Sequence, residues 1–412
     1  MMWFSSALTF VNAQVVVPGG RLARTLRVKN GRIDGIDVAP DKGDEVFDLD
    51  RSFVFPGLIN AHDHLELNSQ PRLKWREKYA NASEWIADFQ PRFENDPALA
   101  VTRAETLDDR VWVGGLKNLL AGVTTVCHHN PMHRVLRRRF PVRLVERFGY
   151  SHSLHIDGDA VAASHHRTPS DWPWMIHAAE GLDAAAQAEL DTFERLGCLS
   201  PNTVFIHGVA FCHDATDRVI GAGAGLVWCP SSNQFLFDAT ADVRAFDDAD
   251  RLALGSDSRL SGARDLLDEL QSAYATRQLS AEGLARTIGA GAARLLRLDD
   301  GGRIEAGARA DLTVFRANED CPYDTLVTAS RSDVRLTMIS GKPATAEPSL
   351  RGLFDATGVE ASSALLDGSP RLVARWIARH VQRMHLQEPG FEVLPSTHRE
   401  SFASAIRSGR GN

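Results

Sequence analysis

The feature that most constrains this chain is an apolar run, residues 53–60, that closes with a His-x-His motif. His62 and His64 end the stretch FVFPGLINAHDH, with Asp63 between them. On an extended strand, residues i and i+2 point to the same face, so both imidazoles would project together from one strand end. Two imidazoles in that position are half of a metal site, although two ordinary polar histidines beside a loop would give the same letters. The motif therefore matters only if other segments supply matching groups.

Three later apolar segments also end in a potential metal ligand. His177 closes WPWMIH and is followed three residues later by Glu180, His207 closes NTVFIH, and Asp257 follows RLALGS. Strands that alternate with helices run parallel, and in a (β/α)8 barrel their carboxyl ends meet on the face that carries active sites. Three histidines and one aspartate suit a divalent cation such as Zn²⁺ and leave a coordination position for water.

Several motifs agree with one known family. The segments PGLINAHDH, HAAEG, HGV and LGSDS occur in order, together with AGVTTV at residues 121–126 and GGRIEAGARADLTVF at residues 301–315. They resemble the amidohydrolase superfamily, most closely its mononuclear-metal branch of cytosine, guanine and adenosine-type deaminases and triazine hydrolases. The resemblance covers about residues 5–345. It implies an α/β fold in which a (β/α)8 TIM-like barrel, residues 55–301, lies beside a small β-sandwich built from residues 1–54 and 302–350.

The resemblance also implies a role for each residue of the set. The metal ligands would be His62, His64, His177 and Asp257, holding one divalent metal, with Zn²⁺ expected and Fe²⁺ compatible with the same donors. The catalytic residues would be Glu180, His207 and Asp257. Glu180 would shuttle protons, His207 would orient the metal-bound water, and Asp257 would accept a proton from that water. A bound metal lowers the pKa of water to about 7, and protonation of a ring nitrogen by Glu180 would make the neighbouring carbon electrophilic.

The predicted activity is hydrolysis of a carbon–nitrogen bond other than a peptide bond. The favoured reaction is hydrolytic deamination of an amino-substituted nitrogen heterocycle, in which metal-bound hydroxide attacks the ring and ammonia leaves. One alternative is a related hydrolase that expels an amine or a halide, or opens a cyclic amide. A second alternative is a non-catalytic metal-binding barrel. Glu180 argues against the second, because a closed structural metal site needs no acid beside it.

The lysines bear on the number of metals. Many amidohydrolases bridge two metals with a carbamylated lysine, but no lysine occurs between Lys117 and Lys342. Lys117 lies in a helix-like segment before the second predicted strand, which is the wrong place for such a bridge. A mononuclear site of the deaminase type is therefore favoured.

Five further polar residues that follow predicted strands are expected to contact substrate: Glu66, His129, Asn130, Ser258 and Arg259. The guanidinium of Arg259 could bind a substrate carboxylate through two nitrogens, or it could pair with an acidic helix residue. The polar cluster Ser231, Ser232 and Asn233 could cap a helix or contact substrate.

Seven barrel strands are predicted, at residues 55–62, 123–128, 142–147, 175–177, 204–207, 225–229 and 252–257. The segment GYSHSLHI, residues 149–156, is the one candidate for the fourth strand, and it follows the third too closely for a full helix between them. Helices are predicted at residues 183–196, 263–277 and 281–296. The connection from His64 to Val123, which contains Trp75 and Trp85, is either a lid over the site or a set of helices packed on the barrel wall or a subunit interface.

Composition describes an ordinary globular enzyme. The 412 residues are 43% hydrophobic and 24% charged, with a net charge of −7, which favours a small-molecule substrate over nucleic acid or a membrane as partner. Five cysteines without a CxxC pair indicate a reducing, cytoplasmic location. The opening MMWFSSALTFVNAQ lacks a basic n-region and is predicted to form the first strand. Relatives in the resembled family often self-associate, which allows a homo-oligomer. Residues 351–412 are predicted to form a helical extension with a mobile tail.

Overall fold

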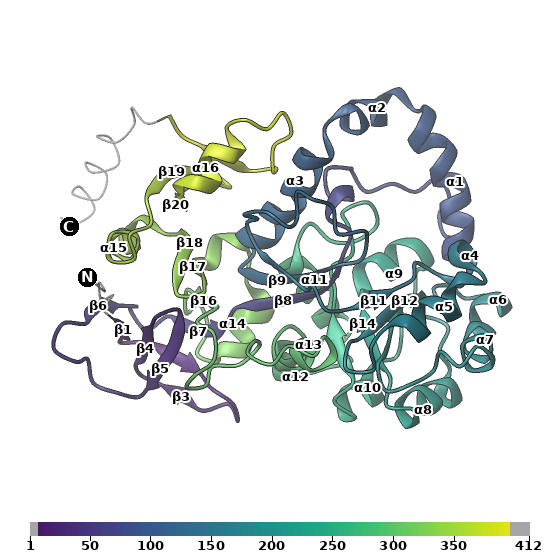
Figure 1. Ribbon diagram of the computed structural model, residues 1–412, viewed down its shortest axis with the longest axis horizontal. Helices are drawn as coiled ribbons and strands as arrows, with labels where there is room; N and C mark the ends of the chain where they lie inside the picture. The colour runs from purple at the N-terminus through teal and green to yellow at the C-terminus, as the bar shows by residue number, and fades with distance from the viewer. Residues whose placement is uncertain (1–6, 396–412) are drawn as a thin grey trace.

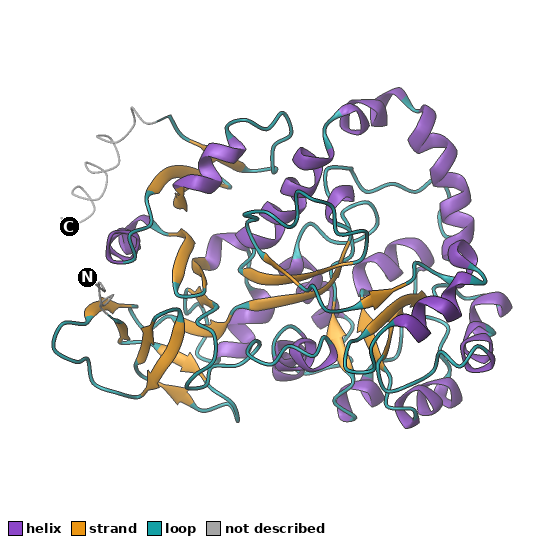
Figure 2. Cartoon of the chain, viewed as in Figure 1, coloured by secondary structure: helices purple, strands orange, loops and turns teal. Residues whose placement is uncertain are grey.

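The computed structural model describes residues 7–395 as an α/β protein that contains two parallel sheets (Figure 1, Figure 2). One sheet has the order β10-β9-β8 and the other has the order β11-β12-β13-β14-β15, and all neighbouring strands in both are parallel. The eight strands are β8 (Leu58–Asp63), β9 (Val123–His128), β10 (Arg143–Leu144), β11 (Gly149–Tyr150), β12 (Trp174–Ala178), β13 (Thr203–His207), β14 (Gly225–Trp228) and β15 (Leu252–Leu254). Because these strands are parallel, their carboxyl ends can present side chains to one shared site.

The two parallel sheets approach each other where β8 meets the segment after β15. The backbone N–H of Asp257 donates to the carbonyl of His62 at 3.1 Å. A Cβ placed on Gly255 would lie 2.6 Å from the Cβ of His62, so this close approach requires glycine. The contact brings the loop after β15 against the end of β8.

The prediction of one strand over residues 55–62 is wrong in its boundaries, because the apolar run forms two strands. β7 (Phe53–Pro56) pairs antiparallel with β16 (Leu312–Phe315), and only β8 joins the parallel sheet. The break falls at Gly57, where a Cβ would lie 2.2 Å from Oγ1 of Thr124. The prediction for the fourth strand is confirmed in its place, because β11 lies within GYSHSLHI and pairs parallel with β12.

The helices differ from the predictions mainly in length. The helix predicted at residues 183–196 is divided into α6 (Ala184–Gln187) and α7 (Glu189–Arg195), and the one at residues 281–296 into α12 (Ala281–Thr287) and α13 (Ala290–Leu295). Gly289 lies at the second break, and glycine favours non-helical backbone. α11 (Leu266–Ala275) begins later than predicted because Asp265 caps it, its carboxylate accepting from the backbone N–H groups of Leu267 and Asp268.

The remaining helical segments cover the sheets and form the long connections. They are η1 (Leu65–Leu67), α1 (Ala82–Asn95), α2 (Pro97–Ala104), α3 (Leu107–Leu120), α4 (Leu154–Asp157), α5 (Ala160–Arg167), α8 (His213–Gly221), α9 (Pro230–Phe237), α10 (Arg244–Asp248), α14 (Pro322–Thr328), η2 (Arg331–Asp333), η3 (Pro348–Leu350), α15 (Arg351–Ala356) and α16 (Arg375–Val381). Within residues 7–395, no helix has the length and apolar character needed to cross a membrane.

Two further sheets lie outside the parallel ones, and the larger takes strands from both ends of the chain. A four-stranded sheet has the order β5-β4-β1-β6, and a nine-stranded sheet has the order β21-β19-β20-β18-β17-β16-β7-β2-β3. Their strands not yet given are β1 (Leu8–Val11), β2 (Gln14–Val16), β3 (Leu22–Ala23), β4 (Leu26–Lys29), β5 (Arg32–Ile36), β6 (Glu45–Asp48), β17 (Val334–Ile339), β18 (Lys342–Ala346), β19 (Ala361–Leu366), β20 (Ser369–Ala374) and β21 (Phe391–Val393). β1 confirms the strand predicted in the opening segment.

The segment after residue 350 differs from the helical prediction. It contains α15 and α16, but also the antiparallel hairpin β19–β20, which joins the nine-stranded sheet through β18. The last four residues of β20 are buried, so pairing and burial outweigh their helix-like pattern. The predicted mobile tail lies outside the described residues.

Candidate active site

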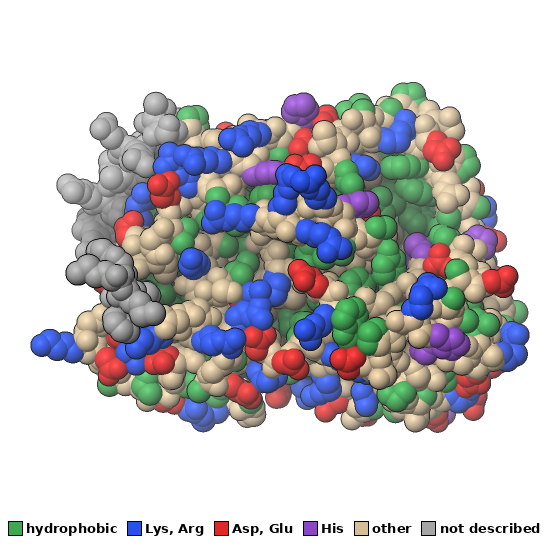
Figure 3. Space-filling view, viewed as in Figure 1, with side chains coloured by type: hydrophobic (Ala, Val, Ile, Leu, Met, Phe, Trp, Pro, Cys, Tyr) green, Lys and Arg blue, Asp and Glu red, His purple; other side chains and the backbone are tan. Residues whose placement is uncertain are grey.

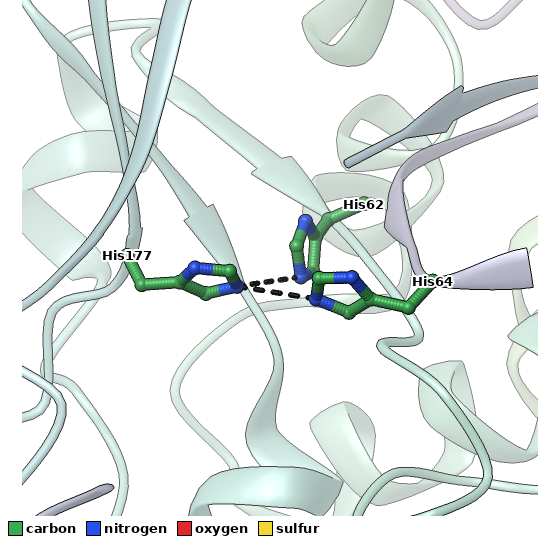
Figure 4. A group of neighbouring side chains, drawn as sticks. All are labelled: His62, His64 and His177. Carbon is green, nitrogen blue, oxygen red and sulfur yellow. Dashed lines mark hydrogen bonds between the residues drawn. The ribbon is translucent and has the colours of Figure 1, made fainter. Parts of the chain in front are cut away.

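Three imidazoles converge at the carboxyl ends of β8 and β12. Nε2 of His177 lies 3.3 Å from Nε2 of His64 and 3.3 Å from Nε2 of His62 (Figure 4). All three side chains are buried. His62 and His64 project together from the end of one strand, as the i, i+2 spacing predicted, and His177 faces them from the other sheet.

The protonation pattern of these imidazoles favours a cation between them. Nδ1 of His177 lies 2.7 Å from the carbonyl oxygen of His152, which can only accept, so Nδ1 carries the proton and Nε2 presents a lone pair. His62 and His64 both direct Nε2 at that lone pair, which can accept from only one of them. Burial, reinforced by the neighbouring histidines, holds the pKa of His62 and of His177 well below the ordinary range, so both are neutral. Neutral imidazole nitrogens are the form that binds divalent metals.

Asp257 supplies a carboxylate beside the three histidines. Its Oδ1 lies 3.8 Å from Nε2 of His62 and 3.9 Å from Nε2 of His64. Its Oδ2 is held by the hydroxyls of Ser232 at 2.8 Å and Ser261 at 2.9 Å. Burial by itself raises the pKa of Asp257, but the nearby imidazoles of His64 and His207 and the hydrogen bonds from the Ser258 backbone N–H and the Ser232 hydroxyl lower it, and the net shift is downward. Three imidazoles and one carboxylate therefore fit a single divalent metal.

Glu180 and His207 form a second pair at the same site. Oε1 of Glu180 lies 3.5 Å from Nε2 of His207, and Nδ1 of His207 lies 2.8 Å from the side-chain oxygen of Asn233. That amide oxygen can only accept, so Nδ1 of His207 carries the proton and Nε2 faces Glu180 with a lone pair. Burial raises the pKa of Glu180 well above its ordinary value, and the charges of Asp257 and Glu189 add to the shift.

Two of these residues have uncommon backbone conformations. His207 has a φ of 76° and Asp257 a φ of 52°, in the left-handed region that residues other than glycine rarely adopt. Each lies just after or at the end of a parallel strand. Such strain persists only where surrounding structure holds it, and it concentrates at functional sites.

Lys117 lies in a buried network under the site and not between metal ligands. Its Nζ is 3.2 Å from Oδ2 of Asp63, 2.8 Å from Oδ1 of Asn68 and 3.0 Å from Oγ of Ser256, and it also donates to the carbonyl of Asp257 at 2.8 Å. All four contacts are to acceptors, which share the three N–H groups of the ammonium, and this is the behaviour of a structural ion pair.

A cavity of about 210 Å³ opens in front of the histidines. Its wall includes Leu67, Trp85, Ile86 and Leu260, and a smaller space of about 60 Å³ that also touches His177 and Glu180 adjoins Ala185 and Glu189. The surface is hollowed on the side of α1, where hydrophobic side chains line the depression (Figure 3). The long connection after His64 therefore reaches the site, because its helix α1 places Trp85 in the cavity wall.

The five predicted substrate contacts lie in different places. Asn130 and Ser258 line the cavity, and the Asn130 amide donates to Glu66, whose other oxygen lies 3.6 Å from Nε2 of His128. His129 is fully buried behind the metal-site histidines, with Nε2 2.9 Å from the carbonyl of Ser151. Arg259 does not line the cavity, because its guanidinium is paired with Glu388.

The pairing of Arg259 decides between its two interpretations. Nη1 and Nη2 lie 2.8 and 2.6 Å from the two carboxylate oxygens of Glu388. An acidic partner is therefore present, although it lies in the loop before β21 and not on a helix. Ser231, Ser232 and Asn233 lie in the first turn of α9, where Ser232 and Asn233 hold Asp257 and His207.

Two residues of the site were not recognised in the sequence. His152 orients His177 through its carbonyl and also lines the cavity, and Ser261 holds Asp257. His152 follows the two-residue strand β11, so its position after a strand end was a usable signal. Ser261 lies in a loop whose course the sequence does not specify. Asn68, which follows His64 and could also have contacted a substrate ring, instead links Lys117 to Asp63.

Comparison with known proteins agrees with the motifs. A family model described as the amidohydrolase family matches residues 162–344. A 5-methylthioadenosine/S-adenosylhomocysteine deaminase of Halobacterium salinarum is 28% identical over 73% of this chain and 83% of its own length. An 8-oxoguanine deaminase of Pseudomonas aeruginosa is 27% identical over 78% of this chain and 89% of its own length. A 5-methylthioadenosine/S-adenosylhomocysteine deaminase of Natronomonas pharaonis is 31% identical, but the match spans less than half of each chain, 43% here and 45% there.

Solved structures show the same fold. An adenosine deaminase from Xanthomonas campestris with bound zinc matches with a TM-score of 0.69 at 19% identity, over 86% of this chain and 97% of its own. The atrazine chlorohydrolase TrzN from Arthrobacter aurescens, complexed with zinc, matches with a TM-score of 0.65 at 18% identity, over 85% of this chain and 99% of its own. The resemblance inferred from the sequence motifs is confirmed.

Proposed function

We propose that this chain, which belongs to the amidohydrolase superfamily, is a metal-dependent hydrolytic deaminase of an amino-substituted nitrogen heterocycle. The observation that carries the proposal is the meeting of three imidazole Nε2 atoms from two strands, with Oδ1 of Asp257 less than 4 Å from two of them. The deaminase names of the sequence relatives from Halobacterium and Pseudomonas support the same reaction class.

One divalent metal would be held by His62, His64, His177 and Asp257. Zinc is proposed because the solved adenosine deaminase and triazine hydrolase are described with zinc, and because nitrogen and carboxylate donors suit it. When bound, such a metal supplies Lewis acidity and lowers the pKa of water toward neutrality.

The protein's own groups would move the protons. Glu180 lines the cavity and partial burial raises its pKa, so its carboxyl group can donate a proton to a ring nitrogen of the substrate. Oδ1 of Asp257 accepts only the backbone N–H of Ser258 at 2.6 Å, while the two serine hydroxyls hold Oδ2, so Oδ1 retains a lone pair that can accept a proton from the attacking water. His207, with its lone pair toward Glu180, would orient the water. The proton taken from water then leaves with the amine as ammonia.

The cavity favours a compact, planar substrate. Its volume of about 210 Å³ and its wall of Trp85, Ile86 and Leu260 suit a single or fused heterocycle, with Asn130 and Ser258 placed to bind its polar edge. The relatives named for methylthioadenosine and 8-oxoguanine deamination make purine-type rings the first compounds to test.

A second reaction of the same site remains open. An imidazolonepropionase of Klebsiella pneumoniae is 26% identical over 55% of this chain, which supports opening of a cyclic amide as the alternative. Loss of an amine or a halide would use the same residues. Measuring ammonia release over purines, pyrimidines, pterins and triazines separates deamination from these reactions.

We also propose that the eight parallel strands form one closed (β/α)8 barrel over residues 55–301, with the β-sandwich formed by residues 1–54 and 302–350. One contact supports closure between the β15 side and β8, namely the bond from the backbone N–H of Asp257 to the carbonyl of His62. A homo-oligomer remains a prediction, checked by light scattering of the purified protein.

The test of the proposed function is Glu180→Gln in the metal-loaded enzyme. Turnover of a substrate found in the ammonia screen should fall at least about 100-fold, while metal content stays at the parent value. Glu194→Gln, at an exposed glutamate paired with Arg218, is the control and should keep parental turnover. Turnover of Glu180→Gln within a few-fold of the parent would refute the proton-donor role. Removal of metal by a chelator should abolish turnover, and Zn²⁺, Fe²⁺ or Mn²⁺ returned singly should identify the cation.

A further inference from the structure

A second cleft, of about 990 Å³, lies beside the loops that carry Asp257. Its wall is formed by residues 68–72, by the loop at residues 259–264, by α11 and by the loop at residues 386–389. Among the described residues, none lines both this cleft and the cavity in front of the histidines. The cleft is therefore a separate space with its own chemistry.

The charges in the wall leave one cation uncompensated. Arg259 is paired with Glu388, and Arg264 is paired with Asp367 at 2.6 Å. Arg72 is exposed, and within the part of the chain that the structure describes no carboxylate lies within ion-pairing distance of it. Its Nε donates to the carbonyl of Ser261 at 2.8 Å, and its Nη2 donates to both the carbonyl and the hydroxyl of Ser231, at 3.0 and 2.8 Å. Among residues 7–395, no acceptor is bonded to Nη1.

An unpaired buried amide lies two residues before Arg72. Gln70 is only 3% exposed, and its Oε1 accepts from the hydroxyl of Thr102 in α2 at 2.9 Å. Its Nε2 has no hydrogen-bond partner among residues 7–395, and neither has the hydroxyl of Ser69, although both residues line the cleft. A buried N–H without an acceptor costs free energy, and such groups in native proteins usually await a ligand or water.

We propose that this cleft binds a small organic anion that presents a carboxylate or phosphate to Arg72 and Gln70. The two N–H groups on Nη1 of Arg72 are the charged donors left for such an oxyanion, and the amide of Gln70 and the hydroxyl of Ser69 add neutral donors. The apolar wall at Val113, Ala263 and Leu386 accommodates the uncharged body of the ligand. Asp268 is the one carboxylate among the described lining residues, so the net charge of the wall favours an anion.

The cleft is connected to the proposed active site through Arg72. The two carbonyls that Arg72 holds belong to Ser231 and Ser261, and the hydroxyls of Ser261 and of Ser232 hold Oδ2 of Asp257. An anion that draws the guanidinium toward the cleft would alter the support of Asp257. Binding of the anion does not depend on the proposed function, whereas an effect of the anion on turnover rests on it.

The test is titration calorimetry of the metal-loaded protein with inorganic phosphate and, separately, with succinate. The anion that the cleft prefers, phosphate or the dicarboxylate succinate, should bind saturably at one site per chain. Gln70→Glu keeps the acceptor for Thr102 but places a negative charge in the cleft, so it should weaken binding at least about tenfold. Asp268→Asn removes the one lining carboxylate and should strengthen binding a few-fold. Gln187→Glu adds the same charge at an exposed position on α6 and should leave binding unchanged.

Two results would overturn the proposal. One is no saturable heat with either anion, and the other is equal affinity in the parent, Gln70→Glu and Asp268→Asn. If binding follows the expected order but neither anion changes ammonia release, the anion site stands and its link to the catalytic site is wrong.

Discussion

Two buried polar clusters include side chains of the same segment, residues 62–64, and they differ in how their polar groups are satisfied. His62 and His64 on β8 meet His177 with three Nε2 atoms directed at one another. Asp63, between them in the chain, points to the other side of the strand and is bonded to Lys117, Asn68 and Asn118. In the cluster around Asp63, the buried carboxylate is bonded to donors. In the histidine cluster, nitrogen lone pairs meet without a donor for each of them. This difference separates a polar cluster that holds the fold from one prepared to bind a cation.

The largest expected effect is at the histidine cluster. His177→Ala removes a proposed ligand, so metal-supported turnover should fall at least about 10³-fold and the metal content of the purified protein should drop below one per chain. Elemental analysis and ammonia release measure both. A His177→Ala protein that keeps stoichiometric metal and parental turnover would show that the histidine cluster is not a metal site.

The cluster around Asp63 should respond in stability instead. Lys117→Met leaves the buried carboxylate of Asp63 without its cation, which should lower the free energy of unfolding by about 3–5 kcal/mol, measured by urea denaturation of metal-free protein. The double variant with Asp63→Asn removes the stranded charge and should recover part of that loss. A change below about 1 kcal/mol for Lys117→Met would show that this ion pair does not stabilise the fold.

A smaller effect is expected where the two clusters meet, at Asp257. Ser261→Ala removes one of the two hydroxyls on Oδ2 and leaves the one from Ser232, so turnover should fall about tenfold and metal should bind more weakly. Ser272→Ala, whose hydroxyl bonds only the carbonyl of Asp268 within its own helix, should leave both unchanged. Competition for metal with a chelator measures the change in affinity. Equal metal affinity in the Ser261→Ala and parent proteins would remove Ser261 from the supporting set.

A pH-dependent effect is expected at a buried acid that belongs to neither cluster. Burial raises the pKa of Glu269 to about 8, since Oε1 accepts only from the Ser231 amide and no cation is bonded to it among the described residues. A folded-state pKa above the unfolded value means that its stabilising contribution is complete below about pH 4.5 and is lost as pH rises toward 8. Stability of the parent should therefore decline over this range, and Glu269→Gln should flatten the decline. Identical slopes in urea denaturation at a series of pH values would show that Glu269 titrates normally.

The sequence predicted the site residues better than the exact elements. His62, His64, His177, His207 and Asp257 each follow an apolar segment, and parallel strands bring such positions to one side regardless of small errors in strand length. The strand predicted over residues 55–62 failed at Gly57, because the need for glycine there comes from Thr124 on a strand more than sixty residues away. Helices were predicted too long for a similar reason, since their breaks at Ala188 and Gly289 reflect local packing that periodicity does not report.

The hydrogen-bond partners of the charged side chains could not be predicted from the sequence. Arg259 lies two residues after Asp257 and was expected near substrate, yet Glu388, 129 residues later, binds its guanidinium. The C-terminal segment that carries Glu388 lay beyond the family resemblance, and its hairpin β19–β20 had been predicted as helix. A charged side chain near a site can point to substrate or to another part of the protein, and only the course of the loops distinguishes the two.

By itself, the sequence determined which groups the structure brings together at the candidate site. The atoms that can bind a metal depend on residue type, which the sequence gives directly. The alternation of strands and helices places the strand ends on one side, so the shared position of these residues also follows from the order of elements along the chain. Tertiary structure alone decided how those groups are supported: the serines on Asp257, the carbonyl on His177, the pairing of Arg259 and the unpaired Arg72 in the second cleft. These contacts join residues far apart in the chain through loops, and a loop's path follows from packing of the whole molecule and not from its own letters.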